Sequence, residues 1–323
     1  MERLLSGIQP SGELHVGNYL GAIRNWVAMQ DTYEAFFFVA NLHSMTVDYE
    51  APDMTRRILD MAKTLLACGV NPRKSCLFVQ SDIVEHAMLA WILNCVTPLG
   101  ELYRMTQFKD KSAQYEQNIN AGLLTYPVLQ AADILIYKAA VVPVGEDQVQ
   151  HLELCREIAR KYNARFGMLF PEPRPLLTRA RRILGLDGKA KMSKSLGNHI
   201  PLLAEPERVW ELLRPAVTDP ARVRRNDPGH PEVCNLYSLH QGFSPEGDVA
   251  EIERDCRSAA IGCVDCKKRL SANMSAELAP VREQYRSLSD DDVRGVLAAG
   301  AQQARSIAQA TLNEVKQATG IAL

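Results

Sequence analysis

The first half of the chain alternates short apolar runs with helical patterns, and this alternation restricts the possible folds more than any other feature. Residues 35–40, 75–80 and 140–144 are mostly apolar runs of strand length. A helical pattern that starts near Pro52 separates the first two runs, and another helical run covers 82–95. Strands that alternate with helices in this way predict an α/β fold with a parallel sheet covered by helices.

Strand signals fade after about Pro175, and helical segments dominate the rest of the chain. The predicted helices cover 206–213, 247–258, 276–287 and 290–317. We therefore expect an α/β domain, a helical domain inserted after it, and a last helix that packs back toward the sheet. The expected bounds of these three units are 1–195, 196–290 and 291–323.

The overall charge excludes a broadly basic nucleic-acid binder. The 323 residues carry a formal net charge of −1, and 46% of them are hydrophobic, as is ordinary for a soluble globular protein. Any contact with RNA must therefore come from local basic clusters, each of which could equally be a solvated face. The clusters are Arg179–Arg182, Arg222–Arg225 and Lys267–Arg269.

No secretory signal is visible at the N-terminus, because Met-Glu-Arg-Leu-Leu-Ser-Gly carries no apolar stretch of the length that a signal peptide has. No stretch approaches the ~20 apolar residues that span a bilayer. We expect a cytoplasmic protein with no membrane partner. Its eight cysteines are not expected to form disulfides, because that compartment is reducing.

The segment from Gly7 to Asn18, GIQPSGELHVGN, follows a short apolar run near the start of the chain and ends where a helical pattern begins. Its glycines allow the backbone to approach a ligand closely, and the helix that follows points free N–H groups at the same place. A phosphate-bearing ligand suits such a turn. The alternative is a turn whose glycines serve geometry only, since neither a dinucleotide-binding fingerprint nor a Walker loop is present.

A second segment with suitable chemistry is Lys191-Met-Ser-Lys-Ser195, which glycines flank on both sides. Two lysines and two hydroxyls suit the charge that builds on a triphosphate when its α-phosphorus is attacked. Alone, such a run is usually a solvated loop. Together with the earlier turn, it indicates a nucleotide site.

A polar stripe marks the otherwise apolar segment 122–138. Tyr126, Gln130, Asp133 and Tyr137 follow at steps of four, three and four, which places them on one face of a helix. Such a stripe either meets water, as surface tyrosines would, or lines a pocket, because an unpaired buried carboxylate is very costly. Pro127 is expected near the first turn of this helix.

Four cysteines lie close together in the helical half, in the pattern C-x21-C-x6-C-x2-C. They are Cys234, Cys256, Cys263 and Cys266. Four thiols in a short helical stretch suggest metal ligation, and the alternative is a set of incidental buried thiols. The other four cysteines sit in apolar runs and are typical of small core residues.

Several of these motifs together resemble a known family. His15-Val-Gly-Asn18 and Lys191–Ser195 resemble the two signatures of class I aminoacyl-tRNA synthetases. The segments Gly7–Gly12, Tyr126–Asp133 and Val142–Gln148 resemble the tryptophanyl-tRNA synthetases, and the likeness runs over nearly the whole chain. It implies a Rossmann-type catalytic domain, a helical anticodon-binding domain and a homodimer.

The resemblance also implies a reaction. L-Tryptophan would react with ATP to give tryptophanyl-adenylate and pyrophosphate, and tryptophan would then pass to the 3′ end of tRNA(Trp). Mg²⁺ would accompany the triphosphate. Such chemistry relies on positioning and charge stabilisation, so no nucleophilic side chain is expected.

The resemblance assigns site residues by position. Catalysis falls to His15, Lys191, Lys194 and Ser195. ATP would contact Gln9, Pro10, Ser11, Gly17, Asn18, Lys111, Gly145, Glu146, Asp147, Ile183, Met192 and Ser193. Tryptophan would contact His43, Tyr126, Gln130, Asp133 and Gln148.

Within the tryptophan set, the resemblance implies that Asp133 accepts a hydrogen bond from the indole N–H. A carboxylate suits this role because indole has one donor and no acceptor. Gln130 stands where many relatives carry methionine, and it could bond Asp133, a backbone group or the indole. A satisfied core histidine is an equal alternative for His43.

For the cysteines, the chain resembles a subset of bacterial tryptophanyl enzymes that hold a [4Fe–4S] cluster in this domain. Zn²⁺ also accepts four thiolates, but the spacing lacks the paired C-x2-C halves of a zinc ribbon, so we favour iron–sulfur. Lys267–Arg269 follows the last cysteine. We hypothesise that the cluster holds this basic segment against the anticodon bases.

Three other functions compete with this interpretation. A tyrosyl-tRNA synthetase shares the fold and the signatures. A tRNA-independent nucleotidyltransferase could use the same turn, although the helical half with its basic clusters argues against it. A non-enzymatic RNA-binding or metal-sensing descendant is disfavoured by the intact Lys191–Ser195 segment.

Overall fold

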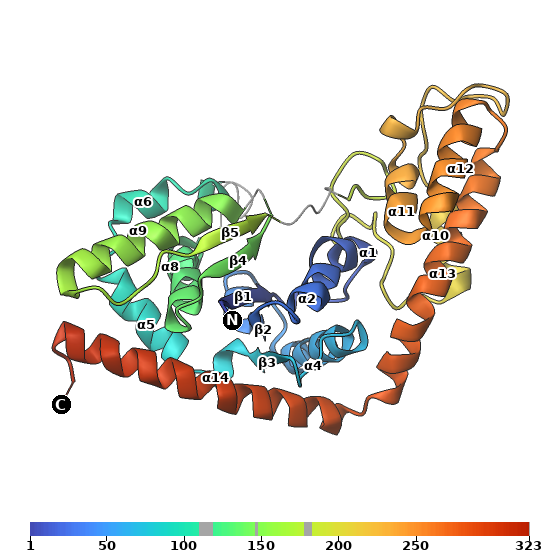
Figure 1. Cartoon of the computed structure of the whole chain (residues 1–323). Helices are drawn as coiled ribbons and strands as arrows, with labels where there is room; N and C mark the ends of the chain where they lie inside the picture. The colour runs from blue at the N-terminus through green and yellow to red at the C-terminus, as the bar shows by residue number, and fades with distance from the viewer. Residues whose placement is uncertain (110–118, 146–147, 178–182, 323) are drawn as a thin grey trace.

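The computed structural model describes residues 1–109, 119–145, 148–177 and 183–322. Its centre is a five-stranded parallel sheet with the strand order β3-β2-β1-β4-β5. The predicted α/β fold with a parallel sheet is confirmed (Figure 1). The strands are β1 (Arg3–Ile8), β2 (Glu34–Val39), β3 (Ser75–Val79), β4 (Val141–Val144) and β5 (Arg174–Leu177).

The central strands are apolar on both faces because each face has its own hydrophobic core. Successive side chains of a strand point to opposite sides of the sheet. Leu4 and Phe37 therefore belong to one core cluster, and Leu5 and Phe36 belong to the other. A parallel sheet that is covered on both faces requires such continuous apolar runs, which is why the sequence revealed β2 and β3 clearly.

Helices cover both faces of the sheet. One face packs against α1 (Val16–Asn18), α2 (Arg24–Met29) and α4 (Ala51–Ala67), where a π-helical turn (Tyr19–Ile23) joins α1 to α2. The other face packs against α5 (Glu85–Asn94), α8 (Ala121–Ile136) and α9 (Val149–Phe166). The short helices are α3 (Asn41–Ser44) and α6 (Leu99–Tyr103).

Two local features differ from the sequence analysis. Strand β5 was not among the predicted strands; it contains Pro175 and is an edge strand, where a missing N–H is tolerated. Helix α8 starts before Gly122, because the Asn120 side chain accepts the Leu123 N–H at 2.9 Å and caps it. Pro127 therefore lies inside the helix and not in its first turn.

The second half of the chain builds a helical lobe and a long final helix (Figure 1). The lobe contains α10 (Pro206–Leu213), α11 (Asn235–Phe243), α12 (Glu246–Arg257) and α13 (Cys263–Ser287). The predicted helix at 276–287 is the last part of α13. Helix α14 (Asp290–Thr319) then runs along the edge strand β3. None of the helices described is long and apolar enough to cross a membrane.

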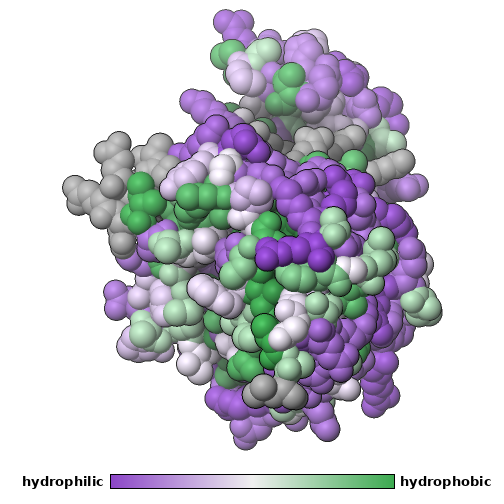
Figure 2. All heavy atoms as spheres, turned by 90° about the vertical axis from the view of Figure 1, so that its left-hand side faces the viewer, coloured by the Kyte–Doolittle hydropathy of each residue, from purple (hydrophilic) through white to green (hydrophobic). Residues whose placement is uncertain are grey.

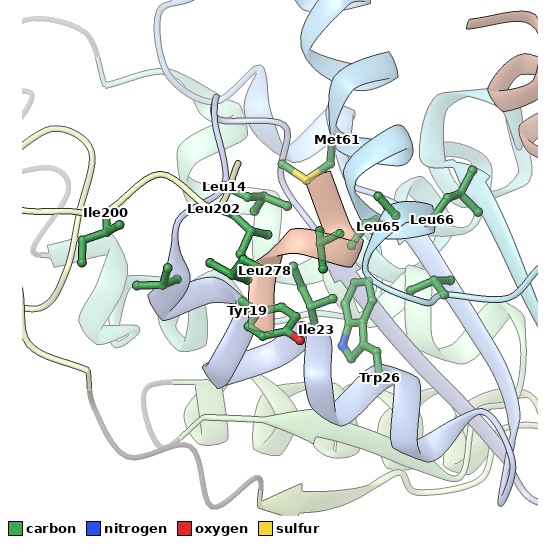
Figure 3. Packing of buried hydrophobic residues seen from close by; sticks show 14 of the residues in the cluster. Leu14, Tyr19, Ile23, Trp26, Met61, Leu65, Leu66, Ile200, Leu202 and Leu278 are labelled. Carbon is green, nitrogen blue, oxygen red and sulfur yellow. The ribbon is translucent and has the colours of Figure 1, made fainter. Parts of the chain in front are cut away.

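The two lobes share one hydrophobic cluster. Figure 3 shows Tyr19 and Ile23 beside Leu202 and Leu278, which come from opposite halves of the chain. The backbone continues this junction, because the Val16 N–H donates to the Ile200 carbonyl at 3.0 Å and the Leu202 N–H to the Leu14 carbonyl at 2.8 Å. Residues 200–202, which the sequence assigns to the helical domain, are thus bonded to the first turn.

Candidate active site

A cavity of about 270 Å³ opens at the carboxyl ends of β1, β2 and β4. Ligands of open parallel sheets bind outside such strand ends, where the strand order reverses, and that point lies here between β1 and β4. All five residues predicted for tryptophan line this cavity. The lining residues are Leu5, Ser6, Gly7, Gln9, Phe38, Ala40, His43, Gln107, Tyr126, Gln130, Asp133, Ile134, Val142, Pro143, Val144 and Gln148.

The polar stripe of α8 is buried. Asp133 is 1% exposed, Tyr126 is 8% exposed and Tyr137 is fully buried. The alternative of a solvent-exposed stripe is therefore wrong. Tyr137 lies behind the cavity, and the other three residues of the stripe line it.

The Asp133 carboxylate accepts hydrogen bonds from three side chains. His43 Nε2 lies 2.8 Å from Oδ2, and His86 Nδ1 lies 2.6 Å from Oδ1. Gln80 Nε2 donates to both oxygens, at 2.8 and 2.9 Å. Burial alone would raise the pKa of Asp133, but the hydrogen bonds from His43 and His86 outweigh burial and lower it. Asp133 is therefore an ionised acceptor at neutral pH.

The other polar residues of the cavity have distinct partners. The Tyr126 hydroxyl lies 2.8 Å from His151 Nε2 and 3.1 Å from Gln107 Oε1, and burial raises the pKa of Tyr126 to about 12. Gln130 lines the cavity but does not contribute to the hydrogen bonds of Asp133, which come from His43, Gln80 and His86 among the described residues. Of the alternatives for Gln130, a bond to Asp133 is thus wrong.

The Gly7–Asn18 turn is tightly organised around His15. The Asn18 side chain accepts the His15 backbone N–H at 3.1 Å, so that this side chain caps the turn itself. Burial, His199 and Lys191 together lower the pKa of His15 to about 4. The His15 ring is consequently neutral at neutral pH, and it can donate a hydrogen bond to a phosphate without carrying a charge.

The Lys191–Ser195 loop lies against that turn. Lys194 Nζ occupies the space above Gly12, where an added Cβ would lie only 2.7 Å from it. Asn198 holds the loop from below, because its Oδ1 accepts the Ser193 N–H at 2.8 Å and its Nδ2 donates to Asp187 at 2.9 Å. Met192 and Ile183 are buried in the core cluster beneath, and the Met192 N–H donates to the Ile183 carbonyl.

Lys194 also borders a second cavity of about 270 Å³, between the turn and α4. Arg57 lines the same cavity. The two segments predicted to bind nucleotide are thus in contact with each other, next to the cavity that holds Asp133. Lys111, Glu146 and Asp147, which were also predicted for ATP, lie outside the described residues.

The four cysteines of the helical lobe come from three helix ends. Cys234 precedes α11, Cys256 lies near the end of α12, and Cys263 and Cys266 begin α13. All four are half-buried free thiols. Burial and the three other thiols of this group raise the pKa of Cys266 to about 12.

Donors surround these thiols. Arg222 Nη1 lies 3.7 Å from Cys256 Sγ, and His240 Nε2 lies 3.4 Å from Cys266 Sγ. However, no three His, Cys, Asp or Glu side chains in the described part of the chain are grouped so as to hold a metal ion.

The hypothesis that Lys267–Arg269 faces anticodon bases is wrong for Lys267. Lys267 Nζ donates to the carbonyls of Arg214 and Ala216, both at 2.7 Å, and is buried beneath α10. Arg269 forms ion pairs with two acidic side chains of α12. Only Lys268 of this segment is exposed.

Sequence reasoning missed Gln80 and His86, although both contact Asp133. Gln80 carried a usable signal, because a polar residue that ends a buried apolar strand of a parallel sheet lies at the ligand-binding edge. His86, in the first turn of a predicted helix, carried none. Asn198 lies close behind the Lys191–Ser195 loop in the sequence, but nothing in the sequence predicts that its side chain fixes this loop.

Comparison with known proteins gives this site a family. Residues 1–279 match the family model described as tRNA synthetases class I (W and Y). The chain therefore belongs to the class I tRNA synthetases that comprise the tryptophan and tyrosine enzymes. Within that family, it belongs with the tryptophan–tRNA ligases, as its relatives show.

Three relatives match over the full length. The tryptophan–tRNA ligase of Deinococcus radiodurans is 48% identical over 99% of both chains. That of Thermotoga maritima is 45% identical, again over 99% of both chains. The crystal structure of tryptophanyl-tRNA synthetase from Campylobacter jejuni, complexed with ADP and tryptophan, is 36% identical with a TM-score of 0.89, over 98% of this chain and 99% of that one.

Proposed function

We propose that the chain activates L-tryptophan with ATP and transfers it to the 3′ end of tRNA(Trp). The observation that carries this proposal is a buried, ionised Asp133 at the base of a cavity that adjoins the Gly7–Asn18 turn and the Lys191–Ser195 loop. The ring N–H of tryptophan is the donor that suits this carboxylate. ATP would lie on the adjoining turn and loop. The cytoplasm is the proposed place of action.

The reaction would run in two steps. A carboxylate oxygen of tryptophan attacks the α-phosphorus of ATP, and pyrophosphate leaves. A ribose hydroxyl at the tRNA 3′ end then attacks the acyl carbon, and AMP leaves. Lys194 and Lys191 would neutralise charge on the phosphates, and His15 would donate a hydrogen bond to them. Mg²⁺, when bound to the triphosphate, would supply further charge neutralisation.

Amino-acid-dependent exchange of pyrophosphate into ATP tests the proposal. We expect exchange with tryptophan and none with tyrosine. Exchange with tyrosine alone would assign the chain to the other half of the family. Activation of an amino acid without subsequent charging of tRNA(Trp) would contradict the second step.

The first mutational prediction concerns Asp133. We expect Asp133→Ala to raise the KM for tryptophan roughly 10- to 100-fold, because a hydrogen bond to a charged acceptor contributes about 1.5–3 kcal/mol. The KM for ATP should change little, since ATP would lie on other elements. An Asp133→Ala variant with unchanged selectivity among aromatic amino acids would rule out this residue as the acceptor.

We further propose that the four cysteines of the helical lobe hold a [4Fe–4S] cluster. Four thiols on three helix ends are the donor set that such clusters use, and Arg222 would offset the negative charge of the thiolates. The cluster would clamp α11, α12 and α13 together. Zn²⁺ also accepts four thiolates, but the C-x21-C-x6-C-x2-C spacing lacks the paired C-x2-C halves of a zinc ribbon, so iron–sulfur is the proposed occupant.

Anaerobic purification followed by iron and sulfide assays tests the cluster. We expect matched iron and sulfide and a visible absorption band that reductant bleaches. Cys263→Ser should lose the iron and lower the melting temperature of the lobe, while Cys68→Ser, which alters a thiol outside the group, should keep it. A colourless protein with stoichiometric zinc, or with no metal, would contradict the proposal.

A homodimer is also proposed, through an apolar stripe on α5. The exposed stripe consists of Val84, the N-cap residue of α5, and of Met88 and Trp91, which follow at steps of four and three. Trp91 is 68% exposed. Figure 2 views the side of the molecule that carries α5 and α6, and hydrophobic residues form a connected area in the middle of it. Leu99 and Tyr103 on α6 are also exposed. Exposed apolar patches of this kind mark interaction sites.

Light scattering after size exclusion tests the dimer. We expect a mass of two 36.0 kDa chains for the native protein. Trp91→Glu should dissociate it, because a charge would be buried in the interface. Val223→Glu, at an exposed apolar position of the helical lobe, is the matched control and should remain dimeric. A monomeric native protein would refute the interface.

A further inference from the structure

The acceptor positions of Asp133 are fully used before any ligand binds. An ionised carboxylate offers about four lone-pair positions. His43 and His86 each take one, and Gln80 takes one on each oxygen. A ligand N–H can therefore bond Asp133 well only if one of these donors gives up its position.

Two of the three donors are held from behind. The side-chain oxygen of Gln80, Oε1, accepts the Leu42 backbone N–H at 3.1 Å, and this bond fixes the orientation of the Gln80 side-chain amide. His86 Nε2 lies 2.7 Å from the Tyr137 hydroxyl. Burial raises the pKa of Tyr137, so its hydroxyl keeps the proton and donates it to Nε2, and His86 Nδ1–H then faces Asp133. Both Gln80 and His86 are fully buried.

His43 is the donor that differs. It is the only one of the three that also lines the cavity. Among the described residues, Asp133 is the hydrogen-bond partner of the His43 ring, and no second partner anchors this ring as Gln80 and His86 are anchored. The His43 ring contacts Tyr126 edge-on, at 6.3 Å between ring centroids. His43 is therefore the donor that can move without breaking a second hydrogen bond.

We propose that Gln80 and His86 are positioning residues that hold the Asp133 carboxylate as the acceptor for the ring N–H of the amino acid, and that this N–H replaces His43. The inference rests on the proposed tryptophan site. This replacement affects selectivity. When the bound amino acid lacks the ring N–H, His43 stays in place and Asp133 keeps all its hydrogen bonds. The gain from the N–H is thus the difference between two hydrogen bonds.

The probe that isolates this difference is the tryptophan analogue in which sulfur replaces the indole N–H, benzothienylalanine. The quantity to measure is kcat/KM in pyrophosphate exchange for tryptophan divided by that for the analogue. Gln80→Leu and His86→Leu should lower this ratio on the order of tenfold or more, mainly through a higher KM for tryptophan. His43→Leu should raise the ratio, because nothing then competes with the N–H for Asp133.

A conservative variant and a matched control separate positioning from mere stability. His86→Asn keeps an N–H toward Asp133 and should restore most of the ratio. Gln30→Leu removes another buried glutamine, which donates to the Gly69 carbonyl, accepts the Asn71 N–H and does not line the cavity. Gln30→Leu should lower the melting temperature about as much as Gln80→Leu. It should leave the tryptophan-to-analogue ratio of kcat/KM unchanged.

The pH dependence gives an independent readout. The titratable groups around Asp133 are His43 on α3, His86 on α5, Tyr137 after α8 and Cys155 on α9. Burial raises the pKa of both Tyr137 and Cys155, so both groups stay protonated at neutral pH and place no second negative charge beside Asp133. In His86→Leu, burial should raise the pKa of Asp133, and the rise in tryptophan KM on acidification should begin at a higher pH than in the native protein.

The outcomes distinguish this inference from the proposed function. If the native protein fails to activate tryptophan, the proposed function fails. If it activates tryptophan, but Gln80→Leu and His86→Leu keep the native ratio and the native pH profile, only the positioning role fails. A fall in the ratio for Gln30→Leu of the same size would show a general loss of packing and would overturn the inference too.

Discussion

Lys194→Ala should lower kcat for tryptophan-dependent pyrophosphate exchange on the order of 100- to 1,000-fold, while ATP affinity falls only a few-fold. Lys194 is an exposed side chain on a loop that is fixed at its base by Asn198. Its ammonium lies above Gly12, beside the turn proposed to hold the phosphates. In the proposed reaction, a positive charge in this position would stabilise the pentacovalent α-phosphorus more than the ground state, so its loss should affect the rate more than binding.

Pre-steady-state adenylate formation and equilibrium ATP binding, measured on the same preparation, check this prediction. Lys189→Ala is the matched control, because Lys189 is an exposed lysine on the same stretch of chain and only its backbone N–H bonds Asp187. That variant should keep its rate within a few-fold. Equal losses of rate and ATP affinity in Lys194→Ala would assign the lysine to ground-state binding.

The sequence predicts the sheet better than it predicts the helical lobe, and the reason is physical. Strands such as β2 are buried on both faces, so their apolar runs are continuous and unambiguous. Helix α11 was not predicted, because the fully buried His240 interrupts its apolar periodicity. Strand β5 was missed because Pro175 is typical of loops and is tolerated only at a sheet edge.

The candidate site shows the same division. Tyr126, Gln130 and Asp133 were predictable, because a polar stripe on an apolar helix has few physical explanations. Gln80 and His86 reach Asp133 from two other elements, and no local pattern encodes that convergence. Lys267 was misassigned for the same reason: a lysine in a basic run gives no sign that two backbone carbonyls bind its ammonium inside the fold.

Gly300→Ala should destabilise the fold by about 2–4 kcal/mol, although alanine normally favours a helix by roughly 1 kcal/mol over glycine. Gly300 lies in the middle of α14, where the helix backbone packs directly on the edge strand β3. A Cβ there would lie 1.9 Å from the Leu77 carbonyl oxygen. Since the obstacle is sheet backbone and not a flexible side chain, either α14 or β3 must shift.

Thermal and denaturant unfolding of two alanine variants in the same helix checks this reversal of sign. Gly295→Ala has no neighbouring atom within 4 Å of the new Cβ, so it should stabilise the protein slightly. Gly300→Ala should also raise the KM for tryptophan, because Gln80 directly follows β3 and a displaced strand would withdraw its amide from Asp133. If both variants were equally stable, α14 could not lie as close to β3 as the structure places it.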